Sequence, residues 1–184
     1  MKSEVEIRKL VRWCYKYNYT DGDSPMSSIL KVDTIQNTGG TTGLTIDSSG
    51  RVLKPVIPYG QASKGGSAQS PTNKITIGTN VLSGGGLTVD TTNHRMIVPI
   101  AGLYAIGFTQ LTDSTNTNTE VHMRKNGNQI SGSSSQTHAG NSYATLSQHM
   151  VIELLANDYI EWWVAAGNVH NNSQYNNHYV YLLG

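Results

Sequence analysis

The strongest constraint on the fold of this chain is the alternation of apolar and polar residues from about residue 72 to the end. Segments such as "RMIVPI" and "GLYAIGFT" carry an apolar side chain at every second position, which is the period of a strand with one buried face. Turn signals separate these segments at intervals of about 8 to 12 residues, and Asn126-Gly127 is the strongest short hairpin signal among them. No helical pattern intervenes. We therefore predict an all-β, antiparallel sandwich or barrel over residues 72–184.

The alternation also gathers apolar residues on one face of each predicted strand. The residues that share a face are Met96, Val98 and Ile100; Tyr104, Ile106 and Phe108; Val121 and Met123; Met150, Ile152 and Leu154; and Ile160, Trp162 and Val164. Trp162 and Trp163 are consecutive and point to opposite faces, so only one of the two rings can enter the core. The other ring needs a cover, and a subunit interface is the usual one. We predict Trp162 and Trp163, together with Tyr179 and Tyr181, as residues of an oligomer interface.

The N-terminal residues 1–25 contain the helical pattern of this sequence. Ile7, Leu10, Val11 and Cys14 recur at helical spacing, so they form one apolar stripe. A single short helix cannot bury such a stripe alone. We predict that this segment is a helical anchor that docks through these four residues on its own domain, on a sister chain or on another protein.

Residues 26–71 are predicted to form a short β stem followed by a linker. "SSILKVDTIQ" alternates, and "LTIDSSGRVL" is typical of a hairpin. Two or three short strands do not form a stable sheet by themselves, so the stem also needs a partner. "YGQASKGGSAQSP", residues 59–71, is predicted to be a flexible passage. The hairpin phrase "GLTIDSSGRVL" recurs further along the chain as "GLTVDTTNHRMI".

Several phrases of the C-terminal zone match those of a known superfamily. Pro99, Gly102 and Tyr104 fit a "P-x-x-G-x-Y" strand, "VHMRKNGNQI" fits a strand that ends in Asn-Gly, and "VIELLANDYIEWWV" fits an "L-x-x-G-D-x-V" strand pair. With "YVYLLG" as the closing strand, residues 80–184 resemble the globular head of the complement C1q and tumour necrosis factor superfamily.

This sequence departs from the family pattern at four positions. Asn157 stands where the family usually has glycine, Met96 and Tyr179 stand where it has phenylalanine, and Tyr181 stands where it has glycine.

The resemblance implies a jelly-roll sandwich that assembles as a compact homotrimer. Three copies of the stem and of the helix could then wind round one axis and bury the apolar side chains that a single copy leaves exposed.

The stem has a resemblance of its own. "MSSILKVDTIQNTGGTTGLTIDSSGRVL" is similar to the N-terminal phrase of tail-fibre and other virion-surface proteins of bacteriophages. This implies a virion structural protein at the virion surface, either a capsid decoration or fibre protein or a tail-attached receptor binder, with capsid or tail proteins as partners. The alternative is a free, soluble C1q-like module that recognises carbohydrate, for which we would expect a secretion signal.

Charge and composition limit the partners of the chain. Charged residues make up 14%, and the 13 Lys and Arg residues balance the 12 Asp and Glu residues to a formal net charge of +1. A near-neutral chain gives no electrostatic case for nucleic acid or an anionic membrane. No apolar run approaches the roughly 20 residues of a membrane helix, and the N terminus lacks the apolar core of a secretion signal. We predict no nucleic-acid partner and no membrane insertion.

Metal sites and catalysis find little support in the sequence. Cys14 is the single cysteine, which excludes an intrachain disulfide and a multi-cysteine zinc site. The six histidines are scattered, and His122 and His149 are predicted on outward faces. A threefold axis could gather three copies of one histidine round a metal ion, but surface histidines are the simpler interpretation. No catalytic motif stands out, so we predict no enzyme and no cofactor.

Three polar loops are the candidates for ligand contact. Amide side chains beside an aromatic ring suit sugars, because they donate and accept hydrogen bonds without charge while the ring stacks. The residues predicted on this basis to contact a host-surface glycan or receptor are Asn116, Asn118, Asn171, Asn172, Tyr175 and Asn176. The other interpretation is that these loops are simply solvated.

Overall fold

A computed structural model describes residues 32–40, 42–53, 57–66, 70, 72–114, 118–138 and 143–184. The predicted anchor with Ile7, Leu10, Val11 and Cys14 lies outside these residues, so its helix stays a prediction. Every regular element in the described part is a β-strand, and neighbouring strands pair antiparallel, which confirms the all-β class. No helix of membrane-spanning length and hydropathy occurs in that part of the chain.

A small antiparallel sheet comprises β1 (Thr34–Gln36), β2 (Thr42–Ile46) and β3 (Val52–Leu53), in that order. The turn between β2 and β3 confirms the predicted hairpin. Asp47 organises this turn, because its carboxylate accepts hydrogen bonds from the amides of Ser49 and Arg51, both at 2.9 Å. The Arg51 side chain completes the loop with an ion pair to Asp47 at 2.7 Å.

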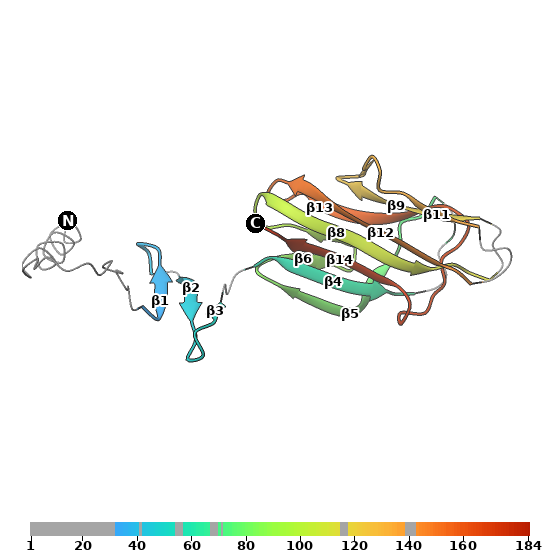
Figure 1. Ribbon diagram of the computed structural model, residues 1–184. Helices are drawn as coiled ribbons and strands as arrows, with labels where there is room; N and C mark the ends of the chain where they lie inside the picture. The colour runs from blue at the N-terminus through green and yellow to red at the C-terminus, as the bar shows by residue number, and fades with distance from the viewer. Residues whose placement is uncertain are drawn as a thin grey trace, which may run out of the picture. The chain divides into compact units, whose positions relative to one another are not determined.

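The described residues from 57 to 184, which we call the head, contain two further antiparallel sheets that lie face to face (Figure 1). The first has five strands in the order β12-β8-β14-β4-β5. Their bounds are β4 (Tyr59–Lys64), β5 (Ile77–Gly84), β8 (Gly102–Leu111), β12 (Thr145–Leu154) and β14 (Asn177–Leu182).

The second sheet of the head has six strands. Its order is β10-β9-β13-β7-β6, and β11 pairs with β9. The bounds are β6 (Thr88–Asp90), β7 (Arg95–Ile97), β9 (Thr119–Lys125), β10 (Asn128–Gln129), β11 (Ser135–Thr137) and β13 (Tyr159–Ala166). Neighbours in each sheet come from distant parts of the chain, as in a jelly roll. The turn between β9 and β10 confirms the Asn-Gly signal, since Asn126 and Gly127 have φ of 51° and 82°.

The start of the head differs from the prediction. Residues 59–64 were predicted as part of a linker that ended at residue 71, but they form β4, an interior strand between β14 and β5. Alternation did not reveal this strand because its inward positions are Gly60, Ala62 and Lys64, which do not form an apolar row. A side chain at Gly60 would clash with Leu87 of the facing sheet, so a small residue is required there.

The core between the two sheets is built from the predicted apolar faces. The fully buried apolar residues include Met96, Val98, Tyr104, Ile106, Phe108, Val121, Met123, Leu154, Ile160, Trp162 and Val164. Met150 and Ile152 are partly buried against them. Ile100 is the exception, at 47% exposure, because β7 ends at Ile97 and the bend at Pro99 breaks the alternation.

Candidate functional site

The outer face of the five-stranded sheet carries a row of aromatic rings. Tyr59 on β4 is opposite Tyr181 on β14, while Tyr179 is opposite Gly107 on β8, which in turn is opposite His149 on β12. Strand alternation directs these side chains away from the core. We call Tyr59, His149, Tyr179 and Tyr181 the aromatic face.

Three rings of the aromatic face, those of His149, Tyr179 and Tyr181, contact one another. Tyr179 and Tyr181 stack with centroids 5.4 Å apart, and His149 stacks on Tyr179 at 5.7 Å. The Tyr179 hydroxyl also lies 2.6 Å from His149 Nδ1. Burial raises the pKa of Tyr179, and the neighbouring Tyr181 adds to this rise, so the Tyr179 hydroxyl keeps its proton at neutral pH. Mutual contacts thus hold these rings in place before any partner arrives.

Gly107 makes the contact between His149 and Tyr179 possible. A Cβ at this position would lie 2.6 Å from the Tyr179 hydroxyl and 2.7 Å from His149 Nδ1. Real side chains do not approach so closely, so any residue other than glycine would push the two rings apart. Gly107 interrupts an apolar strand in the sequence. Glycine is required at this position because the His149 and Tyr179 side chains meet over it on the outer face of the sheet.

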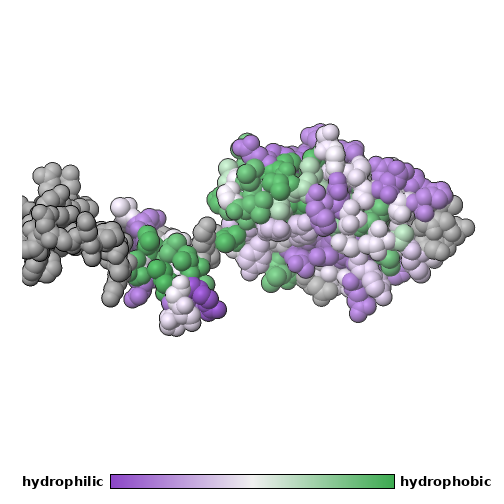
Figure 2. All heavy atoms as spheres, viewed as in Figure 1, coloured by the Kyte–Doolittle hydropathy of each residue, from purple (hydrophilic) through white to green (hydrophobic). Residues whose placement is uncertain are grey.

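Aliphatic residues extend this surface toward the end of the head that carries the C terminus. Leu103, Val151 and Leu183 are all about half exposed, and Leu183 donates its amide to the Leu103 carbonyl at 2.8 Å. Apolar residues gather at this end of the head in Figure 2. Contiguous exposed apolar surface marks interaction sites, and tyrosine is enriched in protein interfaces. With Tyr181 still 42% exposed, the surface is suited to bind another protein chain.

Trp162 is not part of any such surface. Its ring is fully buried within a single chain and packs on His178 with centroids 4.8 Å apart. The prediction of an interface role for Trp162 is therefore wrong, because its inward face belongs to the core of its own sandwich.

Trp163 is the ring that points outward, but its cover comes from the same chain. The Arg124 guanidinium lies 4.0 Å from the ring centroid, and the indole nitrogen donates to Glu161 at 3.0 Å. Lys74 pairs with Glu161 and lies 5.9 Å from the Trp163 ring. These neighbours remove the need for a subunit to cover Trp163, so that reason for the interface prediction fails. The interface role of Tyr179 and Tyr181 stays a prediction, and both lie on the aromatic face.

His122 lies on the outward face of β9, as predicted, but it is buried rather than a surface residue. Arg124 Nε donates to its Nε2 at 3.0 Å. Burial lowers the pKa of His122, and the charge of Arg124 lowers it further. Across the described ranges, no group of three or more His, Cys, Asp or Glu side chains is arranged to hold a metal ion.

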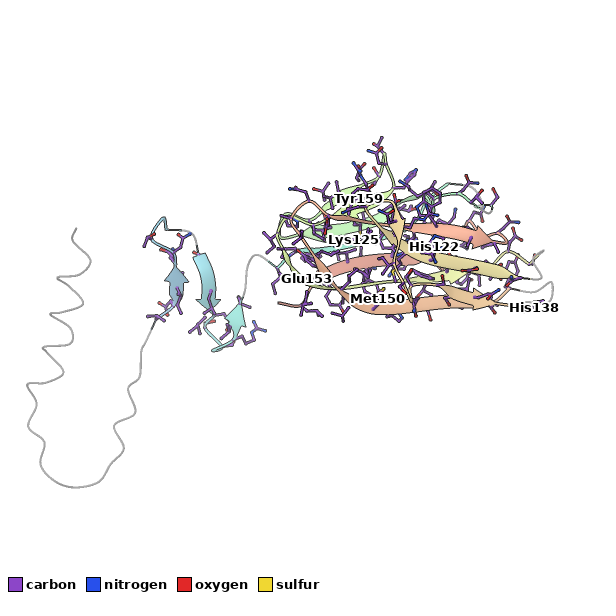
Figure 3. The ribbon with its side chains drawn as sticks, turned by 90° about the horizontal axis from the view of Figure 1, so that it is seen from above. His122, Lys125, His138, Met150, Glu153 and Tyr159 are labelled. Carbon is purple, nitrogen blue, oxygen red and sulfur yellow. The ribbon has the colours of Figure 1, made fainter. Side chains whose placement is uncertain are left out.

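The opposite end of the head is built from polar loops. His138 marks this loop end in Figure 3, and Glu153 marks the other end. The loops contact one another here, since the His170 amide donates to the Leu111 carbonyl at 2.8 Å and Thr112 pairs with Val169.

Asn176 was predicted to contact sugar, and the structure corrects this prediction. The residue is buried, and its side-chain oxygen accepts the Leu111 amide at 2.7 Å. Its side-chain nitrogen donates to the carbonyls of His170, at 2.9 Å, and Asn172, at 2.6 Å. Asn176 therefore holds the loop closed and has no polar group left for a ligand.

The other predicted residues of this loop differ in their exposure to solvent. Asn171 and Tyr175 are exposed. Asn172 is half-buried, and its side-chain oxygen caps a turn by accepting the Gln174 amide at 2.9 Å.

Two predicted residues belong to a neighbouring loop. Asn118 is half-buried, and its side-chain oxygen accepts a hydrogen bond from the side-chain nitrogen of Gln136 at 3.0 Å. Asn116 lies outside the described residues. Tyr143, which the sequence reasoning missed, is an exposed ring that packs edge-on against His170 with centroids 5.3 Å apart. Its flanking residues carry no strand pattern that would have singled it out.

Polar side chains are buried in the core beneath the loop end. His178 Nδ1 lies 3.2 Å from the Ala62 carbonyl, and Gln110 Nε2 lies 2.5 Å from His178 Nε2. Burial lowers the pKa of His178 to about 3, and it lowers the pKa of the neighbouring Lys64 to about 8. A neutral His178 that donates through Nδ1 and accepts through Nε2 satisfies both contacts.

No family model and no curated protein matches the sequence of this chain. Solved structures match its fold. The Eiger TNF from S. frugiperda aligns with a TM-score of 0.58 at 9% identity, over 70% of this chain and 93% of that chain. Murine APRIL at pH 8.0 aligns with a TM-score of 0.55 at 13% identity, over 69% of this chain and 99% of that chain. The head of this protein therefore has the same jelly-roll fold as these structures.

Proposed function

We propose that this chain is a structural protein of a bacteriophage virion, which forms homotrimers and displays its jelly-roll head at the virion surface. The observation that carries the proposal is the aromatic face with its aliphatic border. This surface is apolar, held by its own ring contacts, and exposed in a single chain. Such a surface gains stability when another chain removes it from water.

The N-terminal region supports the virion part of the proposal. The sequence around the small sheet resembles phage tail-fibre and virion-surface proteins, and the head follows it directly in the chain. In this proposal residues 1–25 attach the protein to a capsid or tail protein, while the head faces outward.

The mass of the purified protein tests the homotrimer. We expect light scattering to give three chains per particle for the wild type and one chain for Tyr181→Glu, because a buried, unpaired carboxylate would oppose association. Thr88→Glu, an exposed position on the edge strand β6, is the matched control and should stay trimeric. A wild-type protein that is a single chain at micromolar concentration would contradict the proposal.

Antibody labelling of phage particles tests the location. Labels over the whole capsid would identify a decoration or fibre protein, and labels at the tail would identify a tail-attached protein. Absence of the protein from purified particles would rule out the virion role and favour the free carbohydrate-recognition module.

The loop end supports a role in host attachment. Tyr143 and Tyr175 present exposed rings there, and Asn171 lies in the same loop as Tyr175. Aromatic rings beside neutral amides suit a host glycan. Changing Tyr143 and Tyr175 to alanine should reduce adsorption of phage to host cells, and full adsorption by this variant would remove the attachment role.

A further inference from the structure

The small sheet of strands β1–β3 has one apolar face. Ile35 is paired with Leu44, and Ile46 is paired with Val52, while Leu44 and Ile46 are two residues apart on β2. These four side chains therefore share one side of the sheet. Ile35 is 51% exposed and Val52 is 58% exposed. We call Ile35, Leu44, Ile46 and Val52 the stem face.

The charged groups of the β2–β3 turn, Asp47 and Arg51, lie outside the stem face, whereas Asp33 borders it. Asp33 lies two residues before Ile35 and its carbonyl accepts the Ile46 amide at 2.9 Å, so alternation places its side chain on the side of Ile35 and Ile46. Asp47 and Arg51 already pair with each other within the turn. Apart from Asp33 at its edge, the stem face thus offers a partner aliphatic contact. Three strands this short do not form a stable sheet unless such a face is covered.

We infer that the stem face is covered by the stem faces of two further copies of this chain, packed around the axis of the trimer. This inference rests on the proposed homotrimer. The connection between the sheet and the head supports a copy of the same chain over an unrelated partner. Leu53 ends β3 and Ile57 is the next described residue of the head, four peptide units later.

Four peptide units span at most about 14 Å. Whatever the position of the sheet, three associated heads must therefore keep three stem faces within a few nanometres of one another. A tether this short raises the effective concentration of one stem face for another to about the millimolar range. A foreign aliphatic surface would have to compete with partners that are always present.

Amide hydrogen exchange of the full chain tests the inference. We expect the β2 amides of the wild type to exchange at least about tenfold more slowly than those of Ile46→Asp. Thr45→Asp is the matched control, because Thr45 is the adjacent residue on the other side of the same strand. It should exchange like the wild type. Ile46→Asp should keep the mass of three chains, because the heads still hold it together.

The outcomes separate this inference from the proposed function. Fast exchange of β2 in a wild-type particle of three chains would overturn the inference and leave the homotrimer standing. Fast exchange in a single-chain wild type would overturn both. Slow exchange in a single chain, or equal exchange in the wild type and Ile46→Asp, would show that the stem face is not covered by copies of itself. Protection that arises only in assembled virions would assign the stem face to another virion protein.

Discussion

Two hairpins of this protein are built from nearly the same sequence but have different surroundings. "GLTIDSSGRVL" forms the β2–β3 hairpin of the small sheet, and "GLTVDTTNHRMI" forms the β6–β7 hairpin of the head. In both turns an aspartate accepts backbone amides two to four residues later, and an arginine side chain closes the loop. Asp47 pairs with Arg51 at 2.7 Å, and Asp90 pairs with Arg95 at 3.1 Å. The two turns are therefore closed by the same pair of side chains, an aspartate and an arginine.

Burial separates the two hairpins. Ile46 and Val52 are a cross-strand pair, and Val89 and Met96 are the equivalent pair in the head. Met96 is fully buried between the two sheets of the head, whereas Val52 is exposed. The sequence of a hairpin therefore specifies its turn and its strand pairing. Whether its apolar side chains are buried depends on other parts of the structure.

The turns also differ at the residue with positive φ. Gly50 has a φ of 76° in the small sheet, while His94 has a φ of 52° in the head. A residue with a Cβ is less stable in this conformation than glycine. His94 Nδ1 lies 3.2 Å from the Ile77 carbonyl, a contact that only the folded head supplies. In the head, a tertiary contact thus stabilises a positive φ at a histidine, whereas the small sheet has glycine at the residue with positive φ.

The largest contrast between the hairpins should come from their equivalent apolar residues. Met96→Ala should lower the free energy of unfolding of the head by about 3 kcal/mol, because it leaves a cavity in a closed core. Val52→Ala should leave the unfolding of the head unchanged. Chemical denaturation at a fixed protein concentration measures both values. Equal losses for the two variants would show that the small sheet and the head unfold as one unit.

Between pH 7 and about 4.5, the pH dependence of stability should be confined to the head, because residues 33–53 contain no histidine. His178 stays neutral in the folded head, with its pKa lowered from 6.5 to about 3, but it binds a proton in the unfolded chain. Stability from this residue is present above pH 6.5 and is lost as the pH falls from 6.5 toward 3. The loss is at most about 1.4 kcal/mol per pH unit.

Denaturation of the wild type and His178→Gln between pH 7 and about pH 4.5 measures this slope. The variant should be less stable at pH 7 and should show a shallower decline. His122, whose pKa burial also lowers, accounts for part of the remaining slope. An identical slope in both proteins would mean that His178 does not titrate on unfolding.

The smallest contrast should come from the two aspartates. Asp90 accepts the amides of Thr92 and Asn93, and the Asn93 hydrogen bonds lower its pKa to about 2. Asp90→Ala should lower the free energy of unfolding of the head by about 1 kcal/mol, because these donors lose their acceptor. Asp47→Ala should leave the head unchanged and speed amide exchange in the β2–β3 turn. A head that is insensitive to Asp90→Ala would show that tertiary packing alone holds its hairpin.

Alternation predicted the core well where inward positions were large and apolar. Tyr104, Ile106 and Phe108 are all buried as predicted. The method missed β4 because Gly60, Ala62 and Lys64 face inward there, and it missed β11 because "SQT" is polar throughout. Neither strand could be found from its own residues, since both are stabilised by pairing with strands that lie elsewhere in the sequence.

The candidate site was only partly accessible to sequence reasoning. Tyr179 and Tyr181 were predicted as interface residues, but Tyr59 and His149 join them only because β4 and β12 flank the central strands. Trp163 was predicted to need a subunit, yet Arg124 covers it from the adjacent strand. Asn176 was predicted to be free, yet it closes its own loop. Each error concerns a neighbour that is distant in sequence.

The sequence alone determined the class of this protein, its turns and the faces of most of its strands, because strand period and turn chemistry depend on residues within a few positions of one another. Only the tertiary structure decided which outward side chains found a cover within the chain and which did not. That outcome depends on strand order, and strand order brings together residues as far apart as Tyr59, Tyr181 and His149.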